Sequence, residues 1–276
     1  NVTFTQGCYQ NFTCVNLEVP LDYENTSAGA TSVAFIKFPA AKQPALGDAI
    51  TNPASPGGSG VNYVLSPHAT LTSIMGTSYN LIGTDPRGVN NSGPNIDCFE
   101  EDPSLRDYYD GQYYSKYNPR RPISVKEHWT DAGGFGEWCG RTLSQDAKYA
   151  NTPATAHDML YHTELLAESQ GKPRGKSKLD FFGVSYGSTL ATTFAALWPE
   201  RVGHMIIDGI VDVEDHYGGG WTQTILQADE AVAAFNKFCL EAGPTAPSSR
   251  TTPRPKKSGS ALTPCSPIWT TTHLGH

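Results

Sequence analysis

One serine of this chain stands in a local sequence that could activate it as a nucleophile. Ser185 is the middle residue of the pentapeptide 183–187 (GVSYG), which follows the apolar run 179–182 and precedes the helix-like stretch 188–197. Strand, sharp turn and helix in this order form a nucleophile elbow. We predict that Ser185 is the catalytic nucleophile, and that the backbone N–H of Tyr186, at the positive end of the helix, faces a developing oxyanion.

A loop of small residues is predicted to supply the second oxyanion donor. Residues 48–51 have the pattern of a short strand, and they lead into 52–60 (NPASPGGSG). Small residues let backbone amides approach a ligand closely, so we expect the N–H of Ser55 to be this donor. A plain flexible turn is an alternative. A phosphate-binding loop is disfavoured, because no lysine and Ser/Thr follow the glycines in P-loop order.

The next apolar run ends in a charged turn. Residues 79–84 predict a strand, and 85–89 (DPRGV) a turn beside the elbow. Asp85 and Arg87 have two interpretations, a catalytic acid with an anion clamp or a structural ion pair that braces the loop. We favour the ion pair.

Together these motifs resemble a known family, the secreted tripeptidyl aminopeptidases, which are α/β-hydrolase serine exopeptidases related to prolyl aminopeptidases. The resemblance covers roughly residues 8 to 243 and rests on the order and spacing of segments 16–23 (NLEVPLDY), 52–60, 83–89, 182–187, 199–202 (PERV) and 206–209 (IIDG). It implies Ser185 as nucleophile, Ser55 and Tyr186 as oxyanion amides, and cleavage of short peptides from a free amino terminus. One departure is Ala54-Ser55, where the family usually shows Gly-Gly.

The resemblance also implies the fold and the domain boundaries. We expect an α/β-hydrolase fold, a mostly parallel sheet with helices on both faces, incomplete at the carboxyl end. Residues 1–213 would form the amino-terminal part of the core, and 214–243 the start of a helical lid. Residues 244–276 change to Pro, Ser, Thr, Arg and Lys without periodicity, which predicts a disordered end or a stretch outside the family's reading frame.

The catalytic acid and base are not identifiable in the sequence and are predicted to be absent. In this fold the acid normally follows the seventh strand and the histidine the last, whereas here 204–210 has the pattern of the sixth strand and would form an exposed apolar edge. His157 and Asp158 lie on a predicted amphipathic helix, 155–166, where we expect a surface role. The candidates weighed after Ser185 each fit a structural or solvated role better; they are His204, Asp208, His216, His273 and His276.

Cysteines and sequons predict an oxidising compartment. The six cysteines lack the spacing of a zinc or redox site. We expect the disulfides Cys8–Cys14 and Cys98–Cys139. Cys239 is expected to pair in the lid, and Cys265 would be its partner only if the tail is native. Buried free thiols are the alternative. The aromatic segment 99–138 is predicted to be a long irregular loop with short helices, packed rather than pocket-forming. The glycosylation candidates are Asn1, Asn11, Asn25 and Asn90.

Composition restricts the partners. A net charge of −7 disfavours nucleic acid and anionic membranes, and no apolar run reaches the roughly 18 residues of a membrane helix. The chain begins without methionine, so we expect that a signal peptide has been removed and that the protein is secreted. We expect no metal or cofactor. Three functions remain open: a serine exopeptidase, a catalytically incomplete remnant of one, and a carboxylesterase of the same fold.

Overall fold

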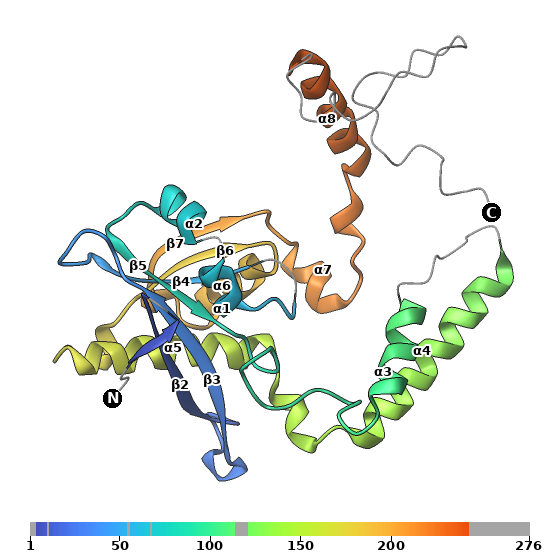
Figure 1. Cartoon of the computed structure of the whole chain (residues 1–276), viewed down its shortest axis with the longest axis horizontal. Coiled ribbons are helices and arrows are strands. Elements are labelled where there is room, and N and C mark those ends of the chain that lie inside the picture. The colour runs from blue at the N-terminus through green and yellow to red at the C-terminus, as the bar shows by residue number, and fades with distance from the viewer. Residues whose placement is uncertain (1–3, 10, 54–55, 67, 114–120, 243–276) are drawn as a thin grey trace. The chain divides into compact units, whose positions relative to one another are not determined.

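The computed structural model describes residues 4–9, 11–53, 56–66, 68–113 and 121–242 of the chain (Figure 1). The described chain divides into two compact units, Asn1–Val211 and Asp212–His276. The first unit contains the sheet and the elbow. The second unit contains α7 (Val213–Gly218), the 3-10 turn η5 (Gln223–Ile225) and α8 (Ala228–Ala242).

A seven-stranded mixed sheet is the framework of the first unit, in the order β1-β2-β3-β5-β4-β6-β7. The strands β4 (Gly47–Asn52), β5 (Tyr79–Thr84), β6 (Leu179–Val184) and β7 (Val202–Asp208) pair in parallel. The strands β1 (Thr5–Tyr9), β2 (Phe12–Pro20) and β3 (Ala30–Phe38) form an antiparallel meander against β5. The parallel half therefore aligns the carboxyl ends of β4, β6 and β7 at one edge.

Helices cover both faces of the sheet, because neighbouring residues of a strand point to opposite faces. Phe35 and Phe181 belong to a core with α5 (Thr152–Ser169) and α6 (Tyr186–Leu197). Their neighbours Ile36 and Phe182 belong to a second core with α1 (Gly60–Leu65) and α2 (His68–Met75). The short 3-10 turns are η1 (Thr26–Ala28), η2 (Gln145–Tyr149), η3 (Arg174–Lys176) and η4 (Pro199–Arg201). This layering confirms the expected α/β-hydrolase architecture.

The edge strand β7 has an exposed apolar side, as the sequence predicted for this segment. The side chain of Ile206 is 54% exposed, and β7 pairs only with β6 among the described strands. An unpaired strand edge with apolar side chains favours association with another strand. In the second unit α8 likewise carries half-exposed apolar side chains, among them Val232, Phe235 and Phe238.

The aromatic segment after β5 is more helical than predicted. It forms α3 (Pro103–Tyr113) and a 21-residue helix, α4 (Pro122–Thr142), where a long irregular loop was expected. The expected disulfide Cys98–Cys139 ties α4 to the chain before α3, and Phe99 packs against Tyr109 and Trp138. The Trp138 Nε1–H donates to the Cys98 carbonyl at 2.7 Å. Tyr109 and Trp138 therefore pack on Phe99, as predicted, whereas Trp129 is 82% exposed.

The other cysteines within the described part of the chain are also oxidised. A disulfide joins Cys8 in β1 to Cys14 in β2, the other expected pair. Cys239 of α8 is disulfide-bonded, which excludes the free-thiol alternative for this residue. Cys265, like the rest of the predicted tail, lies outside the described residues. No helix in the described part of the chain combines the length and apolarity that crossing a membrane would need.

Candidate active site

The backbone at Ser185 has the strained geometry of a nucleophile elbow. Ser185 lies between β6 and α6 with φ 55° and ψ −113°, a conformation that costs a non-glycine residue about 1–3 kcal/mol. Its N–H donates to the Asp208 carbonyl of β7 at 2.8 Å, and its own carbonyl accepts from the Ser188 N–H at 2.8 Å. Hydrogen bonds on both sides thus hold the turn and leave the half-buried Ser185 side chain at the carboxyl edge of the sheet.

Two glycines allow the close packing that the elbow requires. A Cβ atom on Gly183 would lie 2.5 Å from the Gly187 carbonyl oxygen, and a Cβ on Gly187 would lie 2.8 Å from the Asn52 carbonyl oxygen. Both distances are well inside van der Waals contact with backbone atoms, which cannot rotate away. The glycines of the motif are therefore required by packing between β4, β6 and α6.

Ser188 supports the elbow and was not singled out by the sequence. Its buried Oγ donates to the Ser185 carbonyl at 2.6 Å and accepts from the Val211 N–H at 3.0 Å. One hydroxyl therefore links the turn to the segment after β7. Its position directly after the GxSxG motif was the available signal.

The structure describes only one of the two predicted oxyanion donors. Tyr186 is the first residue of α6, where the helix dipole is positive, and its buried phenol shares a 2.8 Å hydrogen bond with the Thr152 hydroxyl of α5. This contact turns the ring toward α5 and holds the start of α6. Ser55 lies outside the described residues.

A buried amide next to this loop has no hydrogen-bond partner in the described chain. Asn52 ends β4 opposite Gly183 and is 1% exposed, yet neither its Oδ1 nor its Nδ2 is hydrogen-bonded. Leaving such groups unsatisfied costs about 1–3 kcal/mol each, so buried amides nearly always have partners. In the sequence Asn52 stood out only as the first residue of the small-residue loop.

The predicted ion pair between Asp85 and Arg87 is wrong, although both residues brace the loop. Asp85 accepts from the Ser59 hydroxyl at 2.5 Å, the Val61 N–H at 3.1 Å and the side chain of Asn91 at 3.0 Å. It thereby ties the start of α1 to the turn after β5. Its carboxylate is fully used by neutral donors, which leaves Arg87 to find another acid.

That acid is Asp158, so the surface role predicted for this residue is also wrong. The Arg87 guanidinium donates from Nε to Oδ2 at 2.7 Å and from Nη2 to Oδ1 at 2.8 Å. The Tyr23 hydroxyl donates to Oδ1 at 2.8 Å, and Arg87 also donates to the carbonyls of Leu21 and Pro20. Asp158 is 0% exposed, because α5 turns this side chain toward the sheet.

Burial and mutual contact decide the protonation of this network. Burial raises the pKa of Asp158, and the hydrogen bonds from Arg87 and Tyr23 oppose that rise. Burial lowers the pKa of Arg87, but its contacts with Asp158 outweigh this and leave the pKa raised. Burial and the neighbouring Asp158 raise the pKa of Tyr23. Arg87 is therefore a structural cation that joins β2, the turn after β5 and α5.

The two candidate histidines of the first unit, His157 and His204, contact groups other than Ser185. His204, whose side chain is 85% exposed, contacts Asp180 through Nδ1 at 3.0 Å near the start of β7. His157 is half-buried, stacked on Tyr23 with ring centroids 3.6 Å apart, and burial lowers its pKa. His216 lies in α7 of the second unit. His273 and His276 lie outside the described residues.

The backbone carbonyl of Asp208 accepts a hydrogen bond from the Ser185 N–H, whereas its carboxylate bonds to the next residue of the chain. Its Oδ1 accepts from the Gly209 N–H at 2.9 Å, and burial together with the charge of Asp208 raises the pKa of Tyr63 on α1. Among the described residues of the first unit, Asp208 and His204 direct their side chains to Gly209 and Asp180 and not to the Ser185 hydroxyl. No group of residues suited to hold a metal occurs among the described ones.

Comparison with known proteins gives the family of this chain. The family model described as the alpha/beta hydrolase fold matches residues 50–260. The chain therefore belongs to the α/β-hydrolase fold family.

Two curated relatives are named as serine peptidases or aminopeptidases. The serine protease Hip1 of Mycobacterium tuberculosis is 31% identical over 204 residues, which cover 72% of this chain and 36% of the relative. The tripeptidyl aminopeptidase of Streptomyces coelicolor is 26% identical over 208 residues, 72% of this chain and 35% of the relative. The chain thus spans little more than a third of the length of these relatives.

A solved structure shows only weak structural and sequence similarity to this chain. Epoxide hydrolase A from Mycobacterium thermoresistibile aligns with a TM-score of 0.35 at 12% identity, over 71% of this chain and 39% of that chain. The family assignment rests on the sequence comparisons.

Proposed function

We propose that this chain provides the nucleophile and oxyanion site of a secreted serine exopeptidase that releases short peptides from free amino termini. The observation that carries the proposal is the strained backbone of Ser185 at the turn between β6 and α6. Strain of this kind is maintained where it presents a side chain for reaction. The names of the two curated relatives support a peptide substrate, and the disulfides support an oxidising compartment.

In the proposed reaction the Ser185 oxygen attacks the scissile carbonyl carbon and passes its proton to a base. The carbonyl π electrons move to oxygen, and the N–H groups of Tyr186 and Ser55 stabilise the oxyanion. When the tetrahedral intermediate collapses, the C–N bond breaks and the leaving amine takes a proton. Water then hydrolyses the ester of Ser185 by the same steps.

A second candidate function is a catalytically incomplete hydrolase core that binds peptides without turnover. The specific observation in its favour is that the described histidines and acids weighed in the first unit, His157, Asp158, His204 and Asp208, are engaged with other partners. Serine hydrolases without their triad partners retain only about a thousandfold rate enhancement over water, which the oxyanion hole and binding provide. A carboxylesterase is the remaining alternative, because the elbow does not distinguish an ester from an amide.

Three substrates separate these functions. The purified chain is assayed with a tripeptide coumarin amide, its N-acetylated counterpart and a p-nitrophenyl ester, each beside Ser185→Ala. Turnover of the free tripeptide amide, with at least about a hundredfold lower kcat/KM for the acetylated one, is the expected result, because an exopeptidase of the proposed type must bind the charged amino terminus that acetylation removes. Turnover of the ester alone would indicate a carboxylesterase. Equal, near-background rates for chain and variant would indicate the incomplete core.

A further inference from the structure

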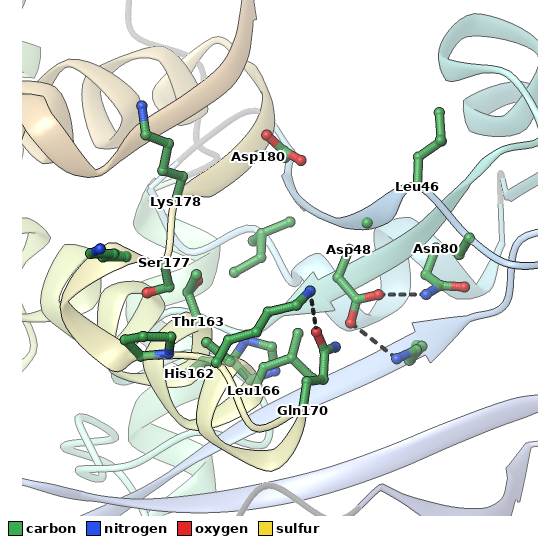
Figure 2. A pocket seen from close by; sticks show the side chains of 18 residues that line it. Leu46, Asp48, Asn80, His162, Thr163, Leu166, Gln170, Ser177, Lys178 and Asp180 are labelled. Carbon is green, nitrogen blue, oxygen red and sulfur yellow. Dashed lines mark hydrogen bonds and ion pairs between the residues drawn. The ribbon is translucent and has the colours of Figure 1, made fainter.

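A pocket lies at the opposite edge of the sheet from Ser185. It opens at the amino ends of β4 and β6 and is closed by the end of α5 and by η3, and Figure 2 shows residues of these elements around it. Strand β6 has six residues at about 3.3 Å each, so the pocket is about 20 Å from the elbow. It is therefore a separate site in the first unit.

The size and walls of this pocket suit a small organic molecule. Its volume is about 530 Å³, within the range of roughly 300–1,000 Å³ that ligand pockets have. Its lining includes the apolar side chains Leu46, Ile50 and Leu166 and the polar side chains Thr163 and Gln170; in Figure 2 Leu166 lies with Thr163 and Gln170, away from Leu46. A ligand here would have a short apolar body and a polar or charged group.

The charges around the pocket favour an anion. Its two carboxylates are already engaged: Asp48 pairs with the Lys37 Nζ at 3.0 Å and accepts from Asn80, and Asp180 accepts from His204 at 2.8 Å and 3.0 Å.

Three lysines at the rim remain without a carboxylate. Among the described residues Lys172 bonds only the Gln170 amide oxygen, at 2.9 Å, and Lys176 and Lys178 have no acidic partner. The nearby acids Glu164 and Glu168 are paired with arginines. The rim therefore carries uncompensated positive charge on a chain whose net charge is −7.

A buried polar side chain in the pocket wall has no partner either. His162 is 1% exposed and stacks on Phe35 with ring centroids 4.3 Å apart, and neither of its ring nitrogens is hydrogen-bonded in the described structure. Burial lowers the pKa of His162 to about 4, so at neutral pH the ring is uncharged and offers one donor and one acceptor. Buried polar atoms normally have partners, and a ligand can supply them.

We propose that this pocket binds a small organic anion, a carboxylate or a phosphate ester with a short apolar body. The rim lysines bind the anionic group, the apolar wall around Leu46 contacts the body, and His162 completes the site. Anionic oxygens accept strong, charge-assisted hydrogen bonds from lysine, which accounts for the choice of ligand charge.

The test is a titration of the ¹⁵N-labelled chain followed by amide resonances. The probes are hexanoate, hexyl phosphate, inorganic phosphate and, as a cationic counterpart, hexylamine. We expect saturable shifts at Gln170, Lys178 and Asp180 with either organic anion, and none with hexylamine. The tighter of the two anions distinguishes a carboxylate ligand from a phosphate ligand. Saturation by inorganic phosphate alone would mean an adventitious ion only and would overturn the proposal.

Charge reversal gives the matched control. Lys176→Glu combined with Lys178→Glu should raise the Kd of hexanoate at least about tenfold, while the same change at exposed Lys126 of α4 should leave it unchanged. His162→Phe keeps the ring against Phe35 and should also raise the Kd. A cooperative thermal melt of each variant establishes that it is folded. An equal effect of Lys126→Glu, or no effect of His162→Phe, would refute the site.

Discussion

Removing Asp158 should destabilise the protein more than any surface change on α5. The variant Asp158→Ala breaks three hydrogen bonds, from Arg87 Nε at 2.7 Å, Arg87 Nη2 at 2.8 Å and the Tyr23 hydroxyl at 2.8 Å. It leaves an arginine whose side chain is 0% exposed without a counter-charge. Removing one partner of a buried ion pair costs about 3–5 kcal/mol of stability. In a domain of this size each kcal/mol lowers the Tm by about 2–4 °C, so the Tm should fall by about 6–20 °C.

The assay is urea unfolding followed by tryptophan fluorescence, with Tm from a thermal scan. Glu168→Ala, which removes an exposed ion pair with Arg174 at the end of the same helix, is the matched control and should cost no more than about 1 kcal/mol. The double variant Arg87→Met with Asp158→Leu should be less destabilised than Asp158→Ala, because no charge is left buried. A loss for Asp158→Ala no larger than that for Glu168→Ala would refute the reasoning.

Three further predictions concern separate parts of the first unit. Gly187→Ala places a Cβ 2.8 Å from a backbone oxygen and should cost about 1–3 kcal/mol or more in urea unfolding, whereas Gly175→Ala, with open space around it, should cost little. His162 has a pKa of about 4 in the folded chain against 6.5 in the unfolded chain, so the unfolded chain binds more protons between these values. The free energy of unfolding should therefore be highest above about pH 6.5 and fall by up to about 3 kcal/mol toward pH 4. A pH series of thermal melts should show this loss in the native chain and not in His162→Phe. Glycopeptide mass spectrometry should find a glycan on Asn25 but not on Asn90; both residues are exposed, but the Nδ2 of Asn90 donates to the Asp85 carboxylate at 3.2 Å, and a fully occupied Asn90 would contradict this.

The elbow could be predicted because it depends on local sequence. An apolar strand, glycines at two fixed positions and a following helix are all contained in residues 179–197, and the strained Ser185 follows from their order. The alternating burial of Phe181 and Phe182 similarly follows from the pattern of a strand with helices on both faces.

The partners of charged residues could not be predicted in the same way. Arg87 and Asp158 are separated by 71 positions, so their pairing depends on how α5 packs against the sheet. Asp85 was a nearer candidate for Arg87, but the start of α1 supplies it with neutral donors instead. Helix α4 was missed because its four glycines, at 133, 134, 136 and 140, disfavour a helix that the disulfide and aromatic packing nevertheless support.

The most direct test of the account is covalent labelling of Ser185 by a fluorophosphonate probe, measured by intact mass. The purified, folded chain is incubated beside Ser185→Ala and beside Ser188→Ala, which removes the hydroxyl that links the elbow to Val211. The account predicts one probe per chain, no labelling of Ser185→Ala and slower labelling of Ser188→Ala. Labelling that persists in Ser185→Ala would contradict the assignment of Ser185 as the nucleophile, and no labelling of a folded chain would contradict the proposed peptidase and indicate the incomplete core.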